Sequence, residues 1–110
     1  MGADMIQLFL SEGLGSFMLA LAVLVCVDSK NKNIFPGDAW IKIGAALAVI
    51  VFLLSPVSGA HVNSMLSVVF YLNDQLSLEN LGVYVVAQML GGVLALTLFK
   101  YFKNSYVVEA

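Results

Sequence analysis

Three long apolar stretches limit what this chain can fold into more than any other feature of its 110 residues. They cover about residues 6–27, 39–54 and 82–99. Few polar side chains interrupt the first stretch, among them Gln7, Ser11 and Glu12. Because the hydrocarbon core of a bilayer is about 30 Å thick, a helix of roughly 20 apolar residues can cross it. The sequence therefore predicts a multi-pass integral membrane protein, a single domain over residues 1–110, embedded in a lipid bilayer.

The composition agrees with a membrane protein and excludes other classes. Hydrophobic residues make up 61% of the chain and charged residues 11%, whereas soluble domains have roughly 45–50% and 25%. The net charge is -2 without a basic run, so we expect no nucleic-acid partner. With His61 as its one histidine, the sequence predicts no metal site. It holds no cofactor motif and no nucleophile–base pair, so we expect no cofactor and no enzyme activity.

Residues 55–72 do not fit a simple three-span protein. Small and polar residues with a proline fill positions 55–63, and the apolar run Ser64–Leu72 is only nine residues long. A nine-residue helix covers about 13 Å, half of a bilayer. We therefore predict a re-entrant loop that leads into a half-helix with Asn63 as its N-cap. The alternative is that residues 39–72 form two ordinary bundle helices, kinked at Pro56.

Three motifs resemble those of the aquaporin, or major intrinsic protein, family. Residues 58–63 (SGAHVN) resemble the family's Ser-Gly-Ala-His-x-Asn-Pro-Ala signature. Residues 12–17 (EGLGSF) look like its first-helix pattern, and residues 84–92 (YVVAQMLGG) look like its third-helix pattern. The resemblance covers roughly residues 5–100. It implies an all-α membrane protein with three transmembrane helices plus one re-entrant half-helix, equivalent to one aquaporin repeat.

Family members carry two inverted repeats, and this chain matches the first. The resemblance implies that a second half must complete the pore. It assigns a set of residues to the pore and half-helix: Asn63, Gly59, Ala60, His61, Ser64, Met65 and Ile43. In this set Asn63 caps the half-helix and turns its amide to the pore midpoint, and residues 59–61 offer backbone carbonyls. The alternatives are a plain N-cap, a tight turn of small residues, and a structural rather than pore-lining His61.

A second set of residues is expected to support this loop. Glu12 lies inside the first span, where an unpaired charge costs at least a few kcal/mol, and the resemblance implies that it holds the loop together with Gln88. Three glycines are interpreted as sites of close helix crossing: Gly15, Gly44 and Gly91. The family's Asn-Pro-Ala triplet reads Asn-Ser-Met at residues 63–65. Met65 adds bulk where two half-helices meet in the family.

The lysines predict an orientation. Three spans place the loop 28–38 and the C-terminus on one side of the membrane, and all five lysines fall on that side. The positive-inside rule then puts the loop 28–38 and the C-terminus in the cytoplasm. One orientation disfavours an antiparallel homo-oligomer and favours a complementary membrane chain as the partner that covers the re-entrant loop.

Two functions follow from these features, and they belong to different classes. The first is an aquaporin-like half-channel subunit for passive transport of water or small neutral solutes when a second half completes it. The second is a non-conducting structural membrane subunit of a larger assembly. A small bundle-type membrane adaptor whose motif is coincidental is a third, more distant, reading.

Overall fold

The computed structural model describes residues 2–28 and 38–106, which form four helices and no strand. In chain order these are α1 (Met5–Val27), α2 (Ala39–Ser58), α3 (Ser64–Leu72) and α4 (Leu78–Tyr106). Most of the predicted loop 28–38, with two of the five lysines, lies outside the described residues.

Three of the helices are long and apolar enough to cross a membrane: Met5–Val27, Ala39–Ser58 and Leu78–Lys103. The fourth, α3, has nine residues. At about 1.5 Å per residue, the 29 residues of α4 make a helix of about 44 Å, which is as long as a bilayer with its headgroups is thick. The predicted fold class, three transmembrane helices and one half-helix equivalent to one aquaporin repeat, is therefore confirmed.

Local capping explains where the helices begin. Asp4 and Gln7 form a capping box at α1, in which each side chain accepts a hydrogen bond from the other residue's backbone N–H. The side chain of Asn63 accepts from the Met65 N–H at 2.8 Å and caps α3. The Ser77 hydroxyl accepts from the Asn80 N–H at 3.1 Å at the start of α4.

The end of α2 differs from the sequence prediction. The helix continues through Pro56 to Ser58, four residues beyond the predicted span 39–54. It stops at Gly59, whose left-handed backbone (φ 82°) lets its N–H donate to the Ser55 carbonyl. The irregular loop is therefore only five residues long, 59–63, and α3 starts anew after it. The alternative of two ordinary helices with a kink at Pro56 is not what the structure shows.

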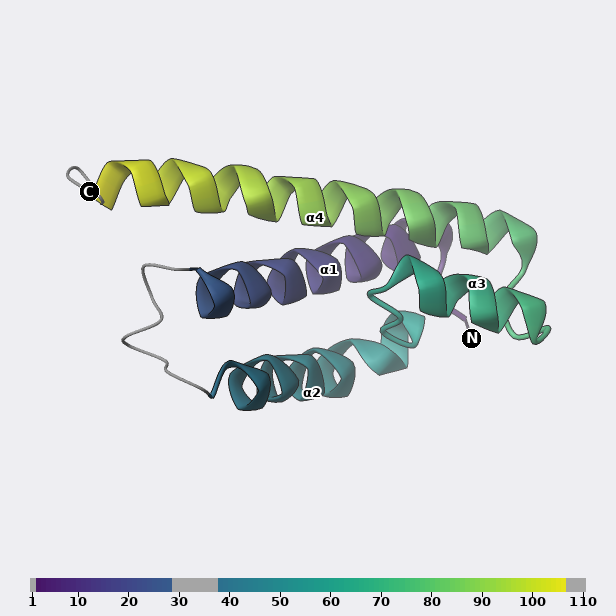
Figure 1. Ribbon diagram of the computed structural model, residues 1–110. Helices are drawn as coiled ribbons and strands as arrows, with labels where there is room; N and C mark the ends of the chain where they lie inside the picture. The colour runs from purple at the N-terminus through teal and green to yellow at the C-terminus, as the bar shows by residue number, and fades with distance from the viewer. Residues whose placement is uncertain (1, 29–37, 107–110) are drawn as a thin grey trace.

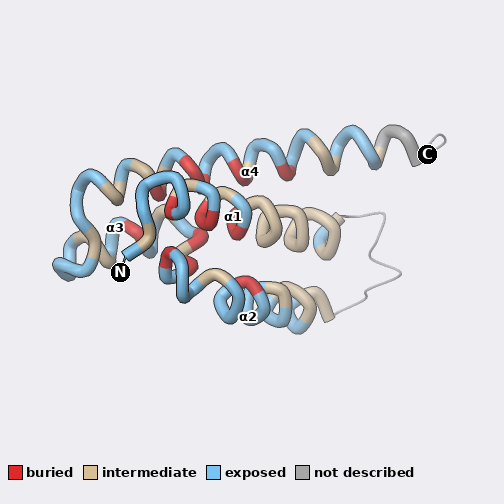
Figure 2. Tube along the Cα trace, turned by 180° about the vertical axis from the view of Figure 1, so that it is seen from behind, coloured by how far each residue is buried: buried red, intermediate tan, exposed pale blue. Residues whose placement is uncertain are grey.

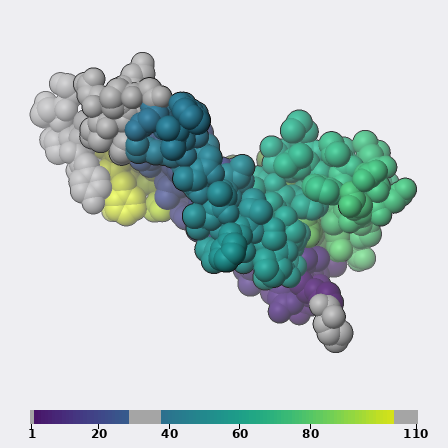
Figure 3. All heavy atoms as spheres, turned by 90° about the horizontal axis from the view of Figure 1, so that it is seen from below, coloured from purple at the N-terminus to yellow at the C-terminus, as the bar shows by residue number. Residues whose placement is uncertain are grey.

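The helices pack around α1. Figure 1 shows α4 lying along α1, with α2 on the other side of α1 and α3 beneath the N-terminal half of α4; the contacts join α1 to α4, α1 to α2 and α3 to α4. Seen from below, α2 and α3 form the exposed lower face (Figure 3). The ends of α1 and α4 and the start of α2 lie at one end of the molecule, and the start of α1 and the α3–α4 turn lie at the other.

Burial is confined to a small central region. In Figure 2 the buried residues gather where α1, the loop after α2 and α4 come together. Several of them are polar: Ser11, Glu12, Ser16, Ser58, Ser67 and Gln88. Large apolar side chains are exposed on all four helices, as expected of helices that face lipid. The core that positions the site therefore combines a hydrogen-bonded polar cluster with buried apolar residues such as Ile50, Val62 and Ala87.

Candidate functional site

Glu12 is the centre of the buried cluster. It lies in the N-terminal half of α1 with 0% of its surface exposed. Its Oε1 accepts from the Val62 N–H at 2.8 Å and the Gln88 amide at 2.9 Å. Its Oε2 accepts from the Ser58 hydroxyl at 2.6 Å and the His61 N–H at 3.0 Å. Four donors converge on the two oxygens, which is the arrangement that a carboxylate needs in a site without water.

Gln88 connects this carboxylate to the half-helix. Its Nε2 donates to Glu12 and also to the Ser67 hydroxyl at 2.9 Å. Its Oε1 accepts from the Ser64 hydroxyl at 2.8 Å. One side chain of α4 therefore uses both amide donors and its oxygen to tie the first turns of α3 to α1.

The loop between α2 and α3 has an unusual backbone that this cluster holds in place. Gly59, Ala60 and Val62 all have positive φ, at 82°, 51° and 45°. Such a conformation costs about 1–3 kcal/mol for a residue with a side chain, and most for a β-branched one such as Val62. The hydrogen bond from the Val62 N–H to Glu12 offsets part of this cost. The strained conformation of the loop is therefore stabilised by the buried Glu12 carboxylate.

Gly15 provides the space for Val62. A Cβ placed on Gly15 would lie 2.5 Å from Val62 Cγ1 and 3.0 Å from Leu54 Cδ1. Only a glycine lets α1 approach the loop and α2 this closely. The structure thus places Gly15 at a helix crossing.

The other two predicted crossing glycines differ from each other. A Cβ on Gly91 would collide with the backbone carbonyl of Gly13 and approach the Phe17 nitrogen to 3.0 Å, so Gly91 lies where α4 crosses α1. A Cβ on Gly44 meets nothing within 4 Å. That face of α2 is open among the described residues, and the role of Gly44 as a crossing contact stays a prediction.

His61 is half-buried and packs against side chains of its own chain. Its ring stacks on Phe70, with centroids 4.5 Å apart, and tilts against Tyr84 at 4.7 Å. Its Nδ1 lies 3.0 Å from the Ser67 hydroxyl. Since the buried Ser67 oxygen already accepts from Gln88, its proton is free to be donated to Nδ1. These contacts favour the structural alternative for His61.

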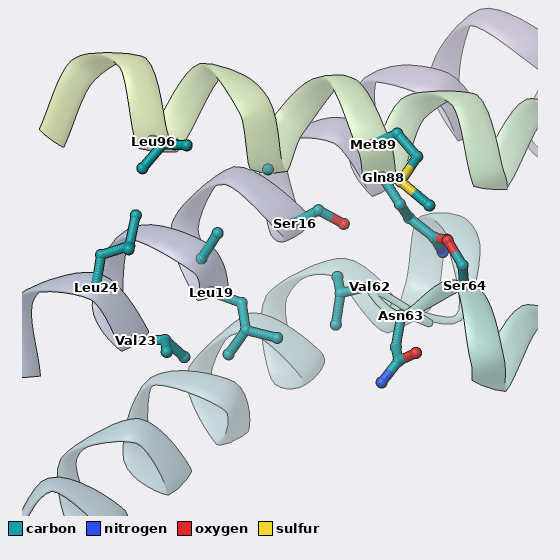
Figure 4. Close-up of a pocket in the computed structure, with 12 residues that line it drawn as sticks. Ser16, Leu19, Val23, Leu24, Val62, Asn63, Ser64, Gln88, Met89 and Leu96 are labelled. Carbon is teal, nitrogen blue, oxygen red and sulfur yellow. The ribbon is translucent and has the colours of Figure 1, made fainter. Parts of the chain in front are cut away.

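Asn63 lies at the end of an open groove (Figure 4). The groove has a volume of about 510 Å³ and runs between α1 and α4 beyond the first turn of α3. Its polar lining residues are Ser16, Asn63, Ser64 and Gln88, and the remainder are apolar or glycine. Figure 4 shows the Asn63 amide pointing away from Gln88 and Ser64, and the residue is exposed. The groove therefore has one polar end and a long apolar flank.

The remaining predicted pore residues lie apart from this cluster. Met65 follows in the first turn of α3 with 64% of its surface exposed. Ile43 is half-buried near the start of α2 and does not line the groove. Their predicted pore roles remain predictions.

Sequence reasoning missed four buried polar residues at the site. Ser11 bonds Ser58 through their hydroxyls at 2.8 Å, and Tyr84 donates to the Ser58 carbonyl at 2.5 Å. Ser67 joins His61 to Gln88, and Ser16 lines the groove. Helical spacing is a signal that could have found three of them, because Ser16 and Tyr84 lie four residues from Glu12 and Gln88, and Ser67 lies three from Ser64.

Two ion pairs lie at the end of the molecule away from α3. Lys103 at the end of α4 pairs with Asp28 at the end of α1 at 2.7 Å. Lys42 pairs with Asp38 at 2.5 Å at the start of α2. Both pairs lie at the end of the molecule where α4 ends (Figure 1). Charges at this end can reach the headgroup region of a bilayer.

Comparison with known proteins agrees with this architecture. The profile described as "Major intrinsic protein" matches residues 2–110. Aquaglyceroporin AqpS of Rhizobium meliloti is 33% identical over 99 residues, which cover 82% of this chain and 41% of that protein. Aquaporin NIP1-1 of Zea mays is 38% identical over 94 residues, covering 82% and 33%. Nodulin-26 of Glycine max is 33% identical over 94 residues, covering 82% and 34%.

The chain thus spans about a third to two fifths of the length of these relatives, and no solved structure matches it significantly. The profile match covers nearly the whole chain, and the three long apolar helices match an integral membrane protein. The chain therefore belongs to the major intrinsic protein family.

Proposed function

We propose that this chain forms one half of a channel for passive transport of water or small neutral solutes, and that a second half completes it. The observation that carries the proposal is the hydrogen-bonded cluster around Glu12. It holds a strained loop and the half-helix α3 so that Asn63 ends at an open groove between two membrane-spanning helices. The relatives described above are named as an aquaporin and an aquaglyceroporin.

The chemistry of this end of the groove suits a neutral polar solute. The N-terminus of α3 carries the positive end of its helix dipole. The Asn63 oxygen is used by the Met65 N–H at 2.8 Å, which leaves the amide protons of Asn63 as donors. A water molecule or a small alcohol accepts such hydrogen bonds, whereas a cation meets positive potential.

A second half is needed because the half-helix and its loop are open on one side. Irregular backbone at membrane depth is tolerated only where protein or a wet cavity covers it. The groove beyond Asn63 runs along α1 and α4, where a second half-helix from the opposite face can lie end to end with α3. In this proposal the chain orients the loop 28–38 and the C-terminus to the cytoplasm, and a complementary membrane chain supplies the other half.

Stopped-flow light scattering on proteoliposomes tests the proposal. The chain is purified in native lipids with the chains that co-purify, and shrinkage is followed after an osmotic step. We expect an osmotic permeability above that of empty vesicles. Replacing Asn63 with leucine should reduce it, while the exposed variant Glu79→Gln should leave it unchanged. A permeability equal to that of empty vesicles, with the assembly intact, would overturn the proposal.

A non-conducting structural subunit is the second candidate, and Met65 favours it. This long side chain is 64% exposed in the first turn of α3, two residues after Asn63, and in this candidate function its bulk closes the passage between the two halves. A structural subunit predicts stable association with unrelated membrane chains, detectable by native mass spectrometry, without permeability. If Met65→Ala raises the permeability of an otherwise closed assembly, the channel is present and Met65 closes it.

A further inference from the structure

A second groove lies between α1 and α4, and the proposed function does not involve it. It has a volume of about 390 Å³, and every residue that lines it is apolar or glycine. It shares no lining residue with the groove that ends at Asn63. Two adjacent glycines of α4 separate the grooves, because Gly91 lines this one and Gly92 lines the other. This groove is therefore a separate feature of the two helices.

Backbone forms the floor of this groove, and leucines form its rims. Gly13 and Gly91 line it where the backbones of α1 and α4 come together. Two leucines of each helix also line it, and all four are 51–62% exposed: Leu10, Leu14, Leu90 and Leu94. The groove therefore opens to the outside of the molecule.

The length and direction of the groove fit a lipid acyl chain. Both helices are long and apolar enough to cross a bilayer. Because α4 lies along α1 (Figure 1), the groove between them follows the direction in which acyl chains run. On α1 it extends from Phe9 to Phe17, about 12 Å of helix at 1.5 Å per residue. One leaflet of the hydrocarbon core is about 15 Å thick, so the groove is about as long as one acyl chain in the leaflet next to the start of α1.

Shape has to select the occupant of such a groove. Lipid tails are as apolar as leucine, so the hydrophobic effect favours no apolar surface over another within a bilayer. A hydrocarbon chain seated on the glycine floor contacts the floor and both leucine rims. Each atomic contact contributes little, but the dispersion attraction of many contacts is large. A chain in the groove is therefore held more strongly than one against a convex helix face.

The charges at one end of the groove select the headgroup. The start of α1 and the α3–α4 turn lie together at this end of the molecule (Figure 1), with carboxylates at Asp4, Asp74 and Glu79. No lysine precedes residue 30 or falls between residues 43 and 99. Carboxylates attract a headgroup that carries an ammonium group and repel one whose only charge is a phosphate.

We propose that this groove binds one acyl chain of a zwitterionic phospholipid, whose ammonium headgroup lies near the carboxylates at the start of α1 and in the α3–α4 turn. The lipid fills the hollow beside the contact of Gly13 with Gly91 and bridges the outer faces of α1 and α4. The site does not depend on the proposed transport, so either proposal can fail without the other.

Native mass spectrometry of the delipidated full chain tests the site. The chain is titrated with palmitoyl-oleoyl phosphatidylethanolamine and, separately, with the anionic phosphatidylglycerol that has the same acyl chains. Gly13→Leu fills the groove, and its Cβ meets Ala87 only at the ordinary contact distances of 3.6 and 4.0 Å. We expect Gly13→Leu to weaken phosphatidylethanolamine binding about tenfold. Binding of phosphatidylglycerol, which the lysines at the other end attract, should not change. Gly92→Leu, in the other groove, is the matched control and should bind both lipids as the wild type does.

A second pair of variants removes bulk instead of adding it and decides the question if Gly13→Leu does not fold. Leu14→Ala takes away one rim of the groove and should weaken phosphatidylethanolamine binding about threefold. Leu53→Ala, at a leucine of α2 that is 56% exposed, is its control and should have no effect. Thermal unfolding shows which variants are folded.

Three results would overturn the proposal. Equal phosphatidylethanolamine binding by the wild type and the folded groove variants overturns the site, as does a loss caused by Gly92→Leu instead. An equal loss for both lipids overturns the selection of the headgroup. A disulfide between two copies of Leu14→Cys, in a Cys26→Ala background, shows that a second copy covers the groove and overturns the lipid as its occupant.

Discussion

At the scale of single residues, a buried acid in a membrane helix is stable only if its environment supplies donors. Glu12 receives four hydrogen bonds from three different parts of the chain: the end of α2, the loop and α4. Two of the donors are backbone N–H groups of the strained loop. The carboxylate therefore accepts hydrogen bonds from loop N–H groups that lie outside any helix and have no partner in a helix backbone.

Glu12→Gln should destabilise the chain by about 2–6 kcal/mol. Glutamine has one acceptor oxygen and presents an NH₂ group to donors that now lack an acceptor, and each unsatisfied buried donor costs about 1–3 kcal/mol. Denaturant titration in mixed micelles, followed by circular dichroism, measures the loss. Glu79→Gln, at an exposed position, is the matched control and should stay within about 0.5 kcal/mol. A Glu12→Gln variant as stable as this control would contradict the role of Glu12.

At the scale of helices, the crossing of α1 and α4 depends on backbone contact. Gly91 faces the Gly13 carbonyl directly, whereas its neighbour Gly92 faces the empty groove. Two adjacent glycines in one helix thus have opposite surroundings, which makes them a matched pair.

Gly91→Ala should destabilise the chain by about 1–3 kcal/mol, because the added methyl group pushes α4 away from the backbone of α1. Gly92→Ala should leave the isolated chain as stable as the wild type or up to about 1 kcal/mol more stable, since alanine is the better helix former. Thermal unfolding of both variants in one detergent makes the comparison. Equal shifts for the two variants would show that α1 and α4 do not cross at Gly91.

The sequence predicts some elements better than others for physical reasons. The range Ser64–Leu72 of α3 agrees with the prediction, because an N-cap asparagine precedes it and the polar residues 73–75 follow. The end of α2 does not agree. Pro56 does not end the helix, because proline is tolerated inside membrane-spanning helices. The next stop signal, Gly59 with its left-handed φ, ends the helix three residues later.

The residues of the candidate site also differ in how well the sequence predicts them. Glu12 and Gln88 stand out in sequence because polar side chains are rare in apolar stretches. Ser11, Ser67 and Tyr84 stand out less, since serine and tyrosine are common in such helices. Their partners lie up to 47 residues away in sequence, and the packing of α1, α2, α3 and α4 shows which residues these partners are.

At the scale of the whole molecule, polar and apolar groups are arranged for a bilayer. The hydrogen-bonded cluster lies inside, large apolar side chains cover the outside, and ion pairs and aromatic side chains lie toward the end with the C-terminus. At that end Trp40 and Tyr101 are 74% and 65% exposed, as is typical of residues at a membrane interface. The two ends of the molecule therefore differ in charge, and this difference predicts how the chain inserts.

The orientation of the chain is the prediction that follows at this scale. Translocating each lysine is costly, so the end with all five lysines should stay on the cytoplasmic side. Single cysteines at Asn31 and Gln75, one in each connecting segment, are labelled with a membrane-impermeant maleimide in a Cys26→Ala background. We expect Gln75→Cys to react from outside intact cells and Asn31→Cys only after lysis. The reverse labelling pattern would contradict the predicted orientation of the chain. Comparable labelling of both from both sides would mean that copies insert in two directions, which would let two copies of this chain face each other across one pore.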